Sequence, residues 1–319
     1  MRKANVMRTF LLSALAVLPL SAAVEGIVTN ATTGKPQAGV PVVLVQPSEK
    51  GMQQLGTATS DASGAFKIDK DPQAGGPILL QSTYKKVTYS KMIAPGQPSK
   101  GVPVEVFEAG TGREGVGVDR HGILFEPTEG KIIIREFVFI DNKSKVTYFD
   151  PDNGTYSFWA PADANIDVSI TTQGGMPVKR PAEKAGTANV FKIAYPMRPG
   201  QTQIELTYEV PKADPMTVSG NVLHKDGEAR LIVPKGYALS GDGLEQFAPE
   251  PRTQSAIYGV KPGPFKVTIS GKAEAVQEED PGQPEVAAAR PRIYTRLPWI
   301  LGLAGAMLAL GLYQLSKAK

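Results

Sequence analysis

Cysteine is absent from the 319-residue sequence, and this absence excludes several kinds of chemistry. Without cysteine the chain has no disulfide, no thiolate nucleophile, no cysteine-type zinc site and no N-terminal cysteine to carry a lipid. Its folded units must therefore be stabilised by packing. The lack of cysteine does not locate the protein, because an exported chain can also fold without disulfides.

Histidine and excess charge are also scarce. The only histidines are His121 and His224, and neither has a carboxylate at the spacing that zinc peptidases use. The sequence contains neither a Gly-x-Ser-x-Gly elbow nor a phosphate-binding loop. We therefore expect a non-enzymatic protein with no catalytic residue, no metal site and no cofactor. A net charge of only +4, with no lysine- or arginine-rich block, argues against nucleic acid as a partner.

The composition favours an all-β protein with more than one folded unit. Glycine (33 residues) and proline (27 residues) are spread along the chain without a three-residue period, which is typical of a protein with many turns. Domains favour about 100 to 150 residues, so the length predicts at least two of them.

The two ends of the chain predict export and membrane anchoring. Residues 1–23 have a basic start, an apolar centre and the small residues Ser21, Ala22 and Ala23, as in a secretory signal peptide. Cleavage would leave Val24 as the first residue; the alternative is an uncleaved anchor. Residues 297–315 are uncharged and apolar, and about 19 helical residues span ~28 Å, roughly one bilayer core.

These ends imply a localisation in the cell membrane with a single span. The bulk of the chain is expected to be exported, in the periplasm or another extracytoplasmic space, and residues 316–319 to be cytoplasmic. Within the span, Gly302 and Ala306, and Gly305 and Ala309, lie four residues apart, which lets membrane helices approach closely. A homo-oligomer through this helix is one interpretation; the other is an ordinary anchor.

Residues 24–108 alternate short β-branched runs with turn clusters, which predicts a first β-sandwich. The runs include Gly26 and Val28, the turn Thr33–Pro36, the strand Gly39–Leu44, and a predicted hairpin with Ser60–Gly64 at its apex, followed by Phe66. This pattern resembles the carboxypeptidase regulatory-like domains, which have a transthyretin-like fold. The resemblance covers about a quarter of the chain and implies a spacer or interaction module, because such a fold alone implies no activity.

Three aromatic residues are candidates for surface contacts. Tyr84 and Tyr89 flank the predicted hairpin tip at Lys85 and Lys86, and Trp159 is the only tryptophan outside the apolar tail. Exposed aromatic rings bind sugars or partner proteins, but aromatic residues in strands more often pack against a core. We favour packing at these positions.

Residues 109–272 contain an internal repeat, with copies at about 111–211 and 206–272. Gly154 precedes Pro161 by seven residues, as Gly227 precedes Pro234, and each glycine follows a turn. Gly200 and Gly263 each open a strand after a basic residue and a proline. The first correspondence has an offset of 73 residues and the second of 63. We expect tandem immunoglobulin-like modules that form one composite sandwich, because ~60 residues bury only a modest core.

One strand of this region has an irregular pattern. In residues 130–141, Ile132, Ile134, Phe137 and Phe139 are apolar, but the alternation changes phase near Arg135 and Glu136. This change predicts a β-bulge at that point.

Residues 150–154, DPDNG, resemble part of a calcium loop, but Pro161 stands where an EF-hand needs glutamate. A turn closed by Asp150 is the preferred interpretation. Residues 273–296 contain almost no large apolar residue and predict an extended linker.

The complete pattern predicts a non-enzymatic, single-pass envelope protein. Its exported β-sandwich region is expected to bind or scaffold another envelope protein, whose identity the sequence does not give. The alternative is a cell-surface adhesion or carbohydrate-binding protein, for which a glycan would be the partner. An enzyme is the disfavoured third class.

Overall fold

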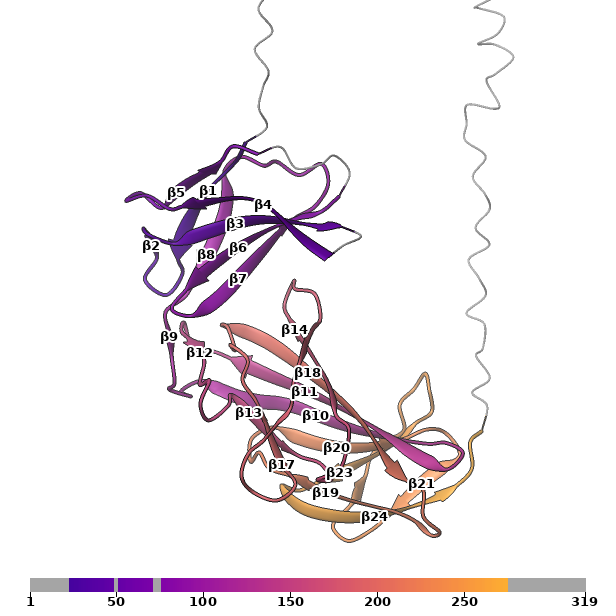
Figure 1. Ribbon diagram of the computed structural model, residues 1–319. Helices are drawn as coiled ribbons and strands as arrows, with labels where there is room; N and C mark the ends of the chain where they lie inside the picture. Colours follow the sequence, from indigo (N-terminus) through magenta and orange to yellow (C-terminus); the bar gives the residue numbers. More distant parts are fainter. Residues whose placement is uncertain (1–22, 49–50, 71–75, 275–319) are drawn as a thin grey trace, which may run out of the picture. The chain divides into compact units, whose positions relative to one another are not determined.

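The computed structural model describes residues 23–48, 51–70 and 76–274 (Figure 1). Every regular element among these residues is a β-strand, so the described part of the chain is all-β. No helix with the length and apolar character of a membrane span occurs within it. Residues 1–22 of the predicted signal peptide, nearly all of the predicted linker and the apolar run 297–315, with its small residues, lie outside the described residues.

The N-terminal region forms two four-stranded sheets. One has the order β2-β1-β5 with β8 parallel to β1, and the other has the order β4-β3-β6-β7. Its strands are β1 (Val24–Asn30), β2 (Lys35–Pro36), β3 (Pro41–Ser48), β4 (Gly51–Thr59), β5 (Ala65–Ile68), β6 (Ile78–Tyr84), β7 (Val87–Ile93) and β8 (Val102–Val106). Alternate residues of these strands, such as Val28, Leu44 and Leu80, are fully buried in one core. This alternation is what a strand with one covered face requires.

The turn at Ser60–Gly64 is present, but the predicted hairpin is wrong. The Asp61 side chain accepts hydrogen bonds from the main-chain N–H groups of Ser63 and Ala65, at 2.8 and 2.9 Å. However, β4 before the turn pairs with β3, whereas β5 after it pairs with β1. The turn therefore carries the chain from one sheet to the other. The β6–β7 hairpin does occur, with Lys85 and Lys86 at φ of 49° and 63°.

The C-terminal region contains one large sheet and several small ones. The eight-stranded sheet has the order β15-β14-β18-β11-β10-β20-β23-β22, and two three-stranded sheets have the orders β13-β17-β16 and β19-β24-β21. Its longer strands are β10 (Val116–Pro127), β11 (Lys131–Asn142), β13 (Tyr156–Trp159), β14 (Asp167–Thr172), β17 (Val190–Ile193), β18 (Gly200–Pro211), β19 (Met216–Val222), β20 (Glu228–Val233), β21 (Tyr237–Ser240), β23 (Ala256–Val260) and β24 (Gly263–Gly271). The short ones are β9 (Ala109–Gly110), β12 (Thr147–Tyr148), β15 (Val178–Arg180), β16 (Glu183–Lys184) and β22 (Glu245–Gln246).

Two sets of strands in the C-terminal region have the same order of pairing. In the first repeat, β11-β18-β14 and β13-β17-β16 are adjacent in that order; in the second, β19-β24-β21 and β20-β23-β22 are adjacent in the same order. Each of these pairings is antiparallel. We therefore call β11 to β18 the first repeat and β19 to β24 the second repeat; these bounds differ from the 111–211 and 206–272 suggested by the sequence, because β10 has no counterpart in the second set.

Strand β10 belongs to neither set and joins the two repeats. It pairs antiparallel with β11 of the first repeat and parallel with β20 of the second. In Figure 1, β18, β11, β10 and β20 run side by side through the larger region. Inward-facing residues of both repeats consequently lie in one hydrophobic cluster, from Val116 to Ile269.

The β-bulge predicted near Arg135 and Glu136 is wrong. Strand β11 pairs with β10 and β18 along its whole length, and the register shift lies on β10, between Val118 and Arg120. Ile132, Ile134 and Glu136 all point inward, and Phe137 therefore points outward. The apparent change of phase arose because a buried glutamate stands where an apolar residue was expected.

Candidate functional site

The tyrosines that flank the β6–β7 hairpin tip are engaged in internal contacts. Tyr89 is 3% exposed, and its hydroxyl donates to the Phe107 carbonyl at 3.1 Å. The Tyr84 hydroxyl donates to Glu108 at 2.7 Å, and Asn30 donates to the same carboxylate oxygen at 2.8 Å. These two hydrogen bonds lower the pKa of Glu108. The hydroxyl groups of both tyrosines are therefore already bonded within the protein, and neither side chain is fully available to a sugar or a partner protein.

The Asp150 loop is closed by its own hydrogen bonds. One carboxylate oxygen of Asp150 accepts from the main-chain N–H of Asn153 at 2.9 Å, and the other accepts from the Asn153 side chain at 3.0 Å. These bonds lower the pKa of Asp150. Across the described residues, no group of three or more histidine, aspartate or glutamate side chains is placed to hold a metal ion.

Trp159, at the end of β13, is partly buried and lines an open cleft of about 480 Å³. Phe265 on β24, Asn221 and Asp242 line the same cleft. The Phe265 ring lies against Gly220, where an added Cβ would stand 2.3 Å from the ring. The cleft thus combines two aromatic side chains, one from each repeat, with an amide and a carboxylate.

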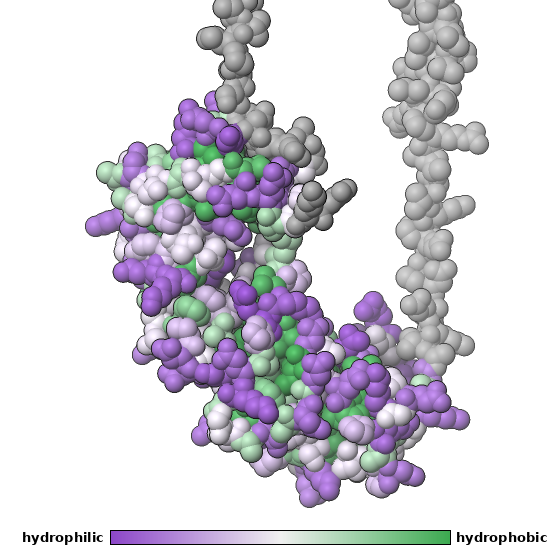
Figure 2. Space-filling model, in the orientation of Figure 1, coloured by the Kyte–Doolittle hydropathy of each residue, from purple (hydrophilic) through white to green (hydrophobic). Residues whose placement is uncertain are grey.

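The outward surface of the eight-stranded sheet carries a second feature that the sequence pattern did not reveal. We call this surface the outer face; it is formed by β18, β11, β10, β20 and β23. Six large apolar side chains on it remain partly exposed: Leu124, Ile133, Phe137, Phe139, Ile232 and Ile257. Figure 2 shows apolar residues gathered between charged ones on the visible side of the larger region.

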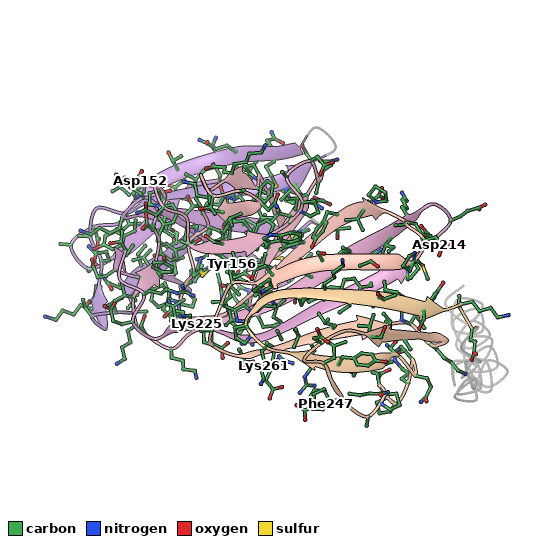
Figure 3. All side chains as sticks on the ribbon, turned by 90° about the horizontal axis from the view of Figure 1, so that it is seen from below. Asp152, Tyr156, Asp214, Lys225, Phe247 and Lys261 are labelled. Atoms are coloured by element: carbon green, nitrogen blue, oxygen red, sulfur yellow. The ribbon has the colours of Figure 1, made fainter. Side chains whose placement is uncertain are left out.

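The charged residues of the outer face are largely paired with one another. Arg135 bonds Glu126 at 2.7 Å, and Arg230 bonds Glu228 at 2.6 Å. Aromatic rings also contact the arginines: Arg230 lies 5.2 Å from the ring centroid of Phe247, which is 38% exposed. In Figure 3, Phe247 and Lys261 lie at the same margin of the sheet. The apolar side chains of the outer face are thus interspersed with paired charges, and Glu205 of β18, opposite Phe137, is a partly exposed carboxylate for which no ion pair occurs among the described residues.

The two histidines, 103 positions apart in the sequence, lie in contact. His121 on β10 is 4% exposed, and its Nδ1 lies 3.0 Å from Nε2 of His224, in the β19–β20 loop. His121 Nε2 lies 2.8 Å from Glu136 on β11, and Tyr208 on β18 donates to Glu136 at 2.8 Å. We call Glu136, His121, His224 and the main-chain carbonyl of Asp226 the histidine network.

Sequence reasoning treated these histidines as unremarkable. The only signal of the network was the glutamate within the apolar pattern of β11. Among the described residues, no serine, threonine or lysine side chain bonds either histidine.

Comparisons with known proteins leave the family open. Neither a protein-family profile nor a curated protein matches the chain. Among solved structures, a mutant of the M1 zinc metallopeptidase from Deinococcus radiodurans matches with 12% identity and a TM-score of 0.29. The unmutated peptidase matches with 13% identity and a TM-score of 0.28. Both matches cover 50% of this chain and 43% of the peptidase chain.

Proposed function

We propose that the chain is a non-enzymatic, single-pass envelope protein whose β-sheet region binds another envelope protein. Support for the anchoring comes from the signal-like residues 1–23 and the apolar run 297–315. Within this proposal, residues 24–108 are a carboxypeptidase regulatory-like, transthyretin-like module, and residues 109–272 are immunoglobulin-like repeats. Self-association through Gly302, Gly305, Ala306 and Ala309 is a separate part of the proposal.

The observation that carries the binding function is the outer face. Contiguous apolar side chains on a protein surface mark sites where partners bind. Strands β10, β11 and β18 are each 12 residues long, whereas β20 has 6 residues and β23 has 5. At ~3.3 Å per residue and ~4.8 Å between strands, five strands offer on the order of 700 Å². Each partner in a typical stable complex buries about 800 Å².

The charges of the outer face indicate the chemistry of the partner. Because Arg135 and Arg230 already have carboxylate partners within 2.7 Å, a bound protein need not supply charges to neutralise them. Burying an unpaired charge would be costly, so a complementary surface should be apolar and uncharged opposite these pairs. We therefore infer a folded protein partner that presents an apolar, largely uncharged face.

Site-specific photo-crosslinking tests this proposal in the full-length protein in its own membrane. A crosslinking residue replaces Phe137 on the outer face, and a matched control replaces Lys91, exposed on β7. We expect one protein to be captured from position 137 only. The captured protein, once purified, should bind the wild-type chain and lose binding to the variant Leu124→Lys. Capture of a second copy alone, or binding that survives Leu124→Lys, would overturn the proposal.

A second candidate function, carbohydrate binding, rests on the Trp159 cleft. Sugar rings stack on aromatic faces, and an amide and a carboxylate such as Asn221 and Asp242 bond hydroxyl groups. A glycan array probed with wild-type protein and with Trp159→Ala tests it. Glycan binding that Trp159→Ala abolishes and Phe247→Ala leaves intact would support this function. Equal binding by all three proteins would exclude the cleft as the site.

A further inference from the structure

The histidine network lies where the two repeats meet. Glu136 and Tyr208 belong to the first repeat, His121 to the joining strand β10, and His224 and Asp226 to the loop between the first two strands of the second repeat. The same loop is fixed to β10 by the Asp226 carboxylate, which accepts from the Val118 N–H at 2.7 Å, beside the β-bulge. Figure 3 labels Lys225, which stands between His224 and Asp226 in that loop.

Three contacts in series make up the network. Glu136 Oε2 lies 2.8 Å from His121 Nε2, His121 Nδ1 lies 3.0 Å from His224 Nε2, and His224 Nδ1 lies 2.5 Å from the Asp226 carbonyl oxygen. A carbonyl oxygen and an ionised carboxylate can only accept, and a neutral imidazole has one donor and one acceptor nitrogen. Each contact therefore needs one hydrogen between its two atoms.

The hydrogens of the neutral groups do not suffice. Two neutral imidazoles supply two hydrogens for three contacts. The Tyr208 hydrogen is already used, because that hydroxyl donates to the other oxygen of Glu136. With Glu136 ionised and both histidines neutral, one contact would place two acceptors face to face. The Glu136–His121 contact is buried and the His121–His224 contact is partly buried; in the exposed third contact, His224 Nδ1 and the Asp226 carbonyl oxygen lie only 2.5 Å apart, a distance at which a hydrogen bond needs a hydrogen between them. A buried acceptor without a donor costs free energy, so the geometry calls for a third hydrogen.

We propose that the histidine network, which joins the loop of the second repeat to the first repeat, binds one additional proton that completes its three contacts, and that the network acts as a pH-sensitive lock. The proton resides on Glu136 or on an imidazole, and in every arrangement His224 Nδ1 carries a hydrogen toward the Asp226 carbonyl. Raising the pH removes the proton and leaves one contact unmade. Lowering it further adds a second proton, which sets two donors face to face.

The other ionisable groups around the network fit this proton count. Burial raises the pKa of Tyr208 and of Tyr156, on β13, so both keep their hydrogens. Burial, together with the neighbouring His121, lowers the pKa of His224, and the positive charge of Arg113 acts in the same direction. The Asp226 carboxylate accepts a hydrogen bond from the Val118 N–H, and Asp226 acts in the opposite direction on His224, raising its pKa through its main-chain carbonyl and its negative charge.

Nitrogen NMR of the full-length protein in detergent micelles tests the proton count directly. Because the chain contains only two histidines, ¹⁵N-histidine labelling gives two imidazole rings, and His224→Phe assigns them. We expect a hydrogen on Nδ1 of His224 from about pH 6 to about pH 8, although a free neutral histidine, with an ordinary pKa of ~6.5, favours the other nitrogen. A bare Nδ1 on His224 throughout this range would overturn the proposal.

Hydrogen exchange tests the lock. After correction for intrinsic exchange, amides of β20, which pairs with β10, should exchange on the order of tenfold faster once the network loses its proton. In His224→Phe this pH dependence should vanish, whereas the matched neighbour Lys225→Ala should retain it. If His224→Phe keeps the wild-type pH dependence, the network is not a lock. The NMR spectra are recorded on the wild-type protein, and His121→Phe gives the same assignment by elimination if His224→Phe folds poorly.

Discussion

The two repeats of the C-terminal region have the same strand pairings but differ in how deeply their side chains are buried. At equivalent inward positions, Phe158 of the first repeat corresponds to Leu231 of the second, and Ile204 corresponds to Val267. Nearly all of the large, fully buried side chains of the two repeats belong to the first, and Leu231 is the exception. The two repeats therefore share their strand order, but the second repeat contributes fewer large buried side chains. Its core is completed by residues of β10 and of the first repeat.

The largest expected effect comes from breaking the buried polar contacts that Glu136 of the first repeat makes with Tyr208 and with His121 on the joining strand β10. Glu136→Ala leaves His121 Nε2 and the Tyr208 hydroxyl without their acceptor in a buried site. Removing one member of a buried charged network costs about 3 to 5 kcal/mol. We expect a loss of this size in the free energy of unfolding measured with urea. Glu209→Ala, which breaks the exposed pair with Lys131, should cost less than about 1 kcal/mol.

Core truncations at equivalent positions test whether the repeats fold together. Leu231→Ala should cost about 2 to 5 kcal/mol and Phe158→Ala about 3 to 5 kcal/mol. Residues of both repeats share one core, so residues 109–272 should unfold in a single transition in each variant, at a lower free energy of unfolding than in the wild type. Hydrogen exchange measures this free energy in both repeats. Separate unfolding of the second repeat in Leu231→Ala, with the first still protected, would contradict this interpretation.

The equivalent glycines provide a sharper comparison. Gly154 and Gly227 both have positive φ, 82° and 74°, which costs roughly 1 kcal/mol or more for a residue with a Cβ. A Cβ at 227 would also stand 2.4 Å from the Val118 carbonyl oxygen, whereas a Cβ at 154 meets the flexible Lys192 side chain at 2.9 Å. Gly227→Ala should therefore lower the melting temperature more than Gly154→Ala. Equal effects would mean that the loop is not held against β10.

The smallest effect concerns pH. Burial lowers the pKa of His224 in the folded state below its ordinary value of 6.5. The unfolded state consequently binds the proton first as the pH falls, and stability present above about pH 6.5 is lost toward the lowered pKa. Because His224 is only half buried, solvent screens the effect, and we expect less than about 1 kcal/mol. Urea melts of wild type and His224→Phe at several pH values, with Lys225→Ala as control, measure it.

Much of the local structure followed from the sequence, because turns and strands depend on neighbouring residues. The Lys85–Lys86 hairpin tip and the turn at Asp61 lie where the pattern placed them. The pairing of the strands after Asp61 was mispredicted, since a turn does not specify which sheet its strands join. Strand β11 was misread because both of its faces carry apolar residues, and a shift of one residue exchanges the two faces.

The candidate sites were less predictable than the strands. The outer face could not be recognised, because sequence alternation does not tell which of two apolar faces the core covers. The Trp159 cleft needs Phe265 from the other repeat, more than 100 residues away in the chain. The histidine network forms only because three neighbouring strands and one loop bring distant residues into contact. These are His121 on β10, Glu136 on β11, Tyr208 on β18 and His224 in the β19–β20 loop.

The sequence by itself determined the all-β character and the turn glycines, since these depend on composition, alternation and local backbone preference. Only the tertiary structure decided that β10 joins the two repeats, that Glu136 is buried and that both histidines share one network. The physical reason is that sheet order, register and burial are set by contacts between distant residues, whose free energy appears only once the strands are assembled.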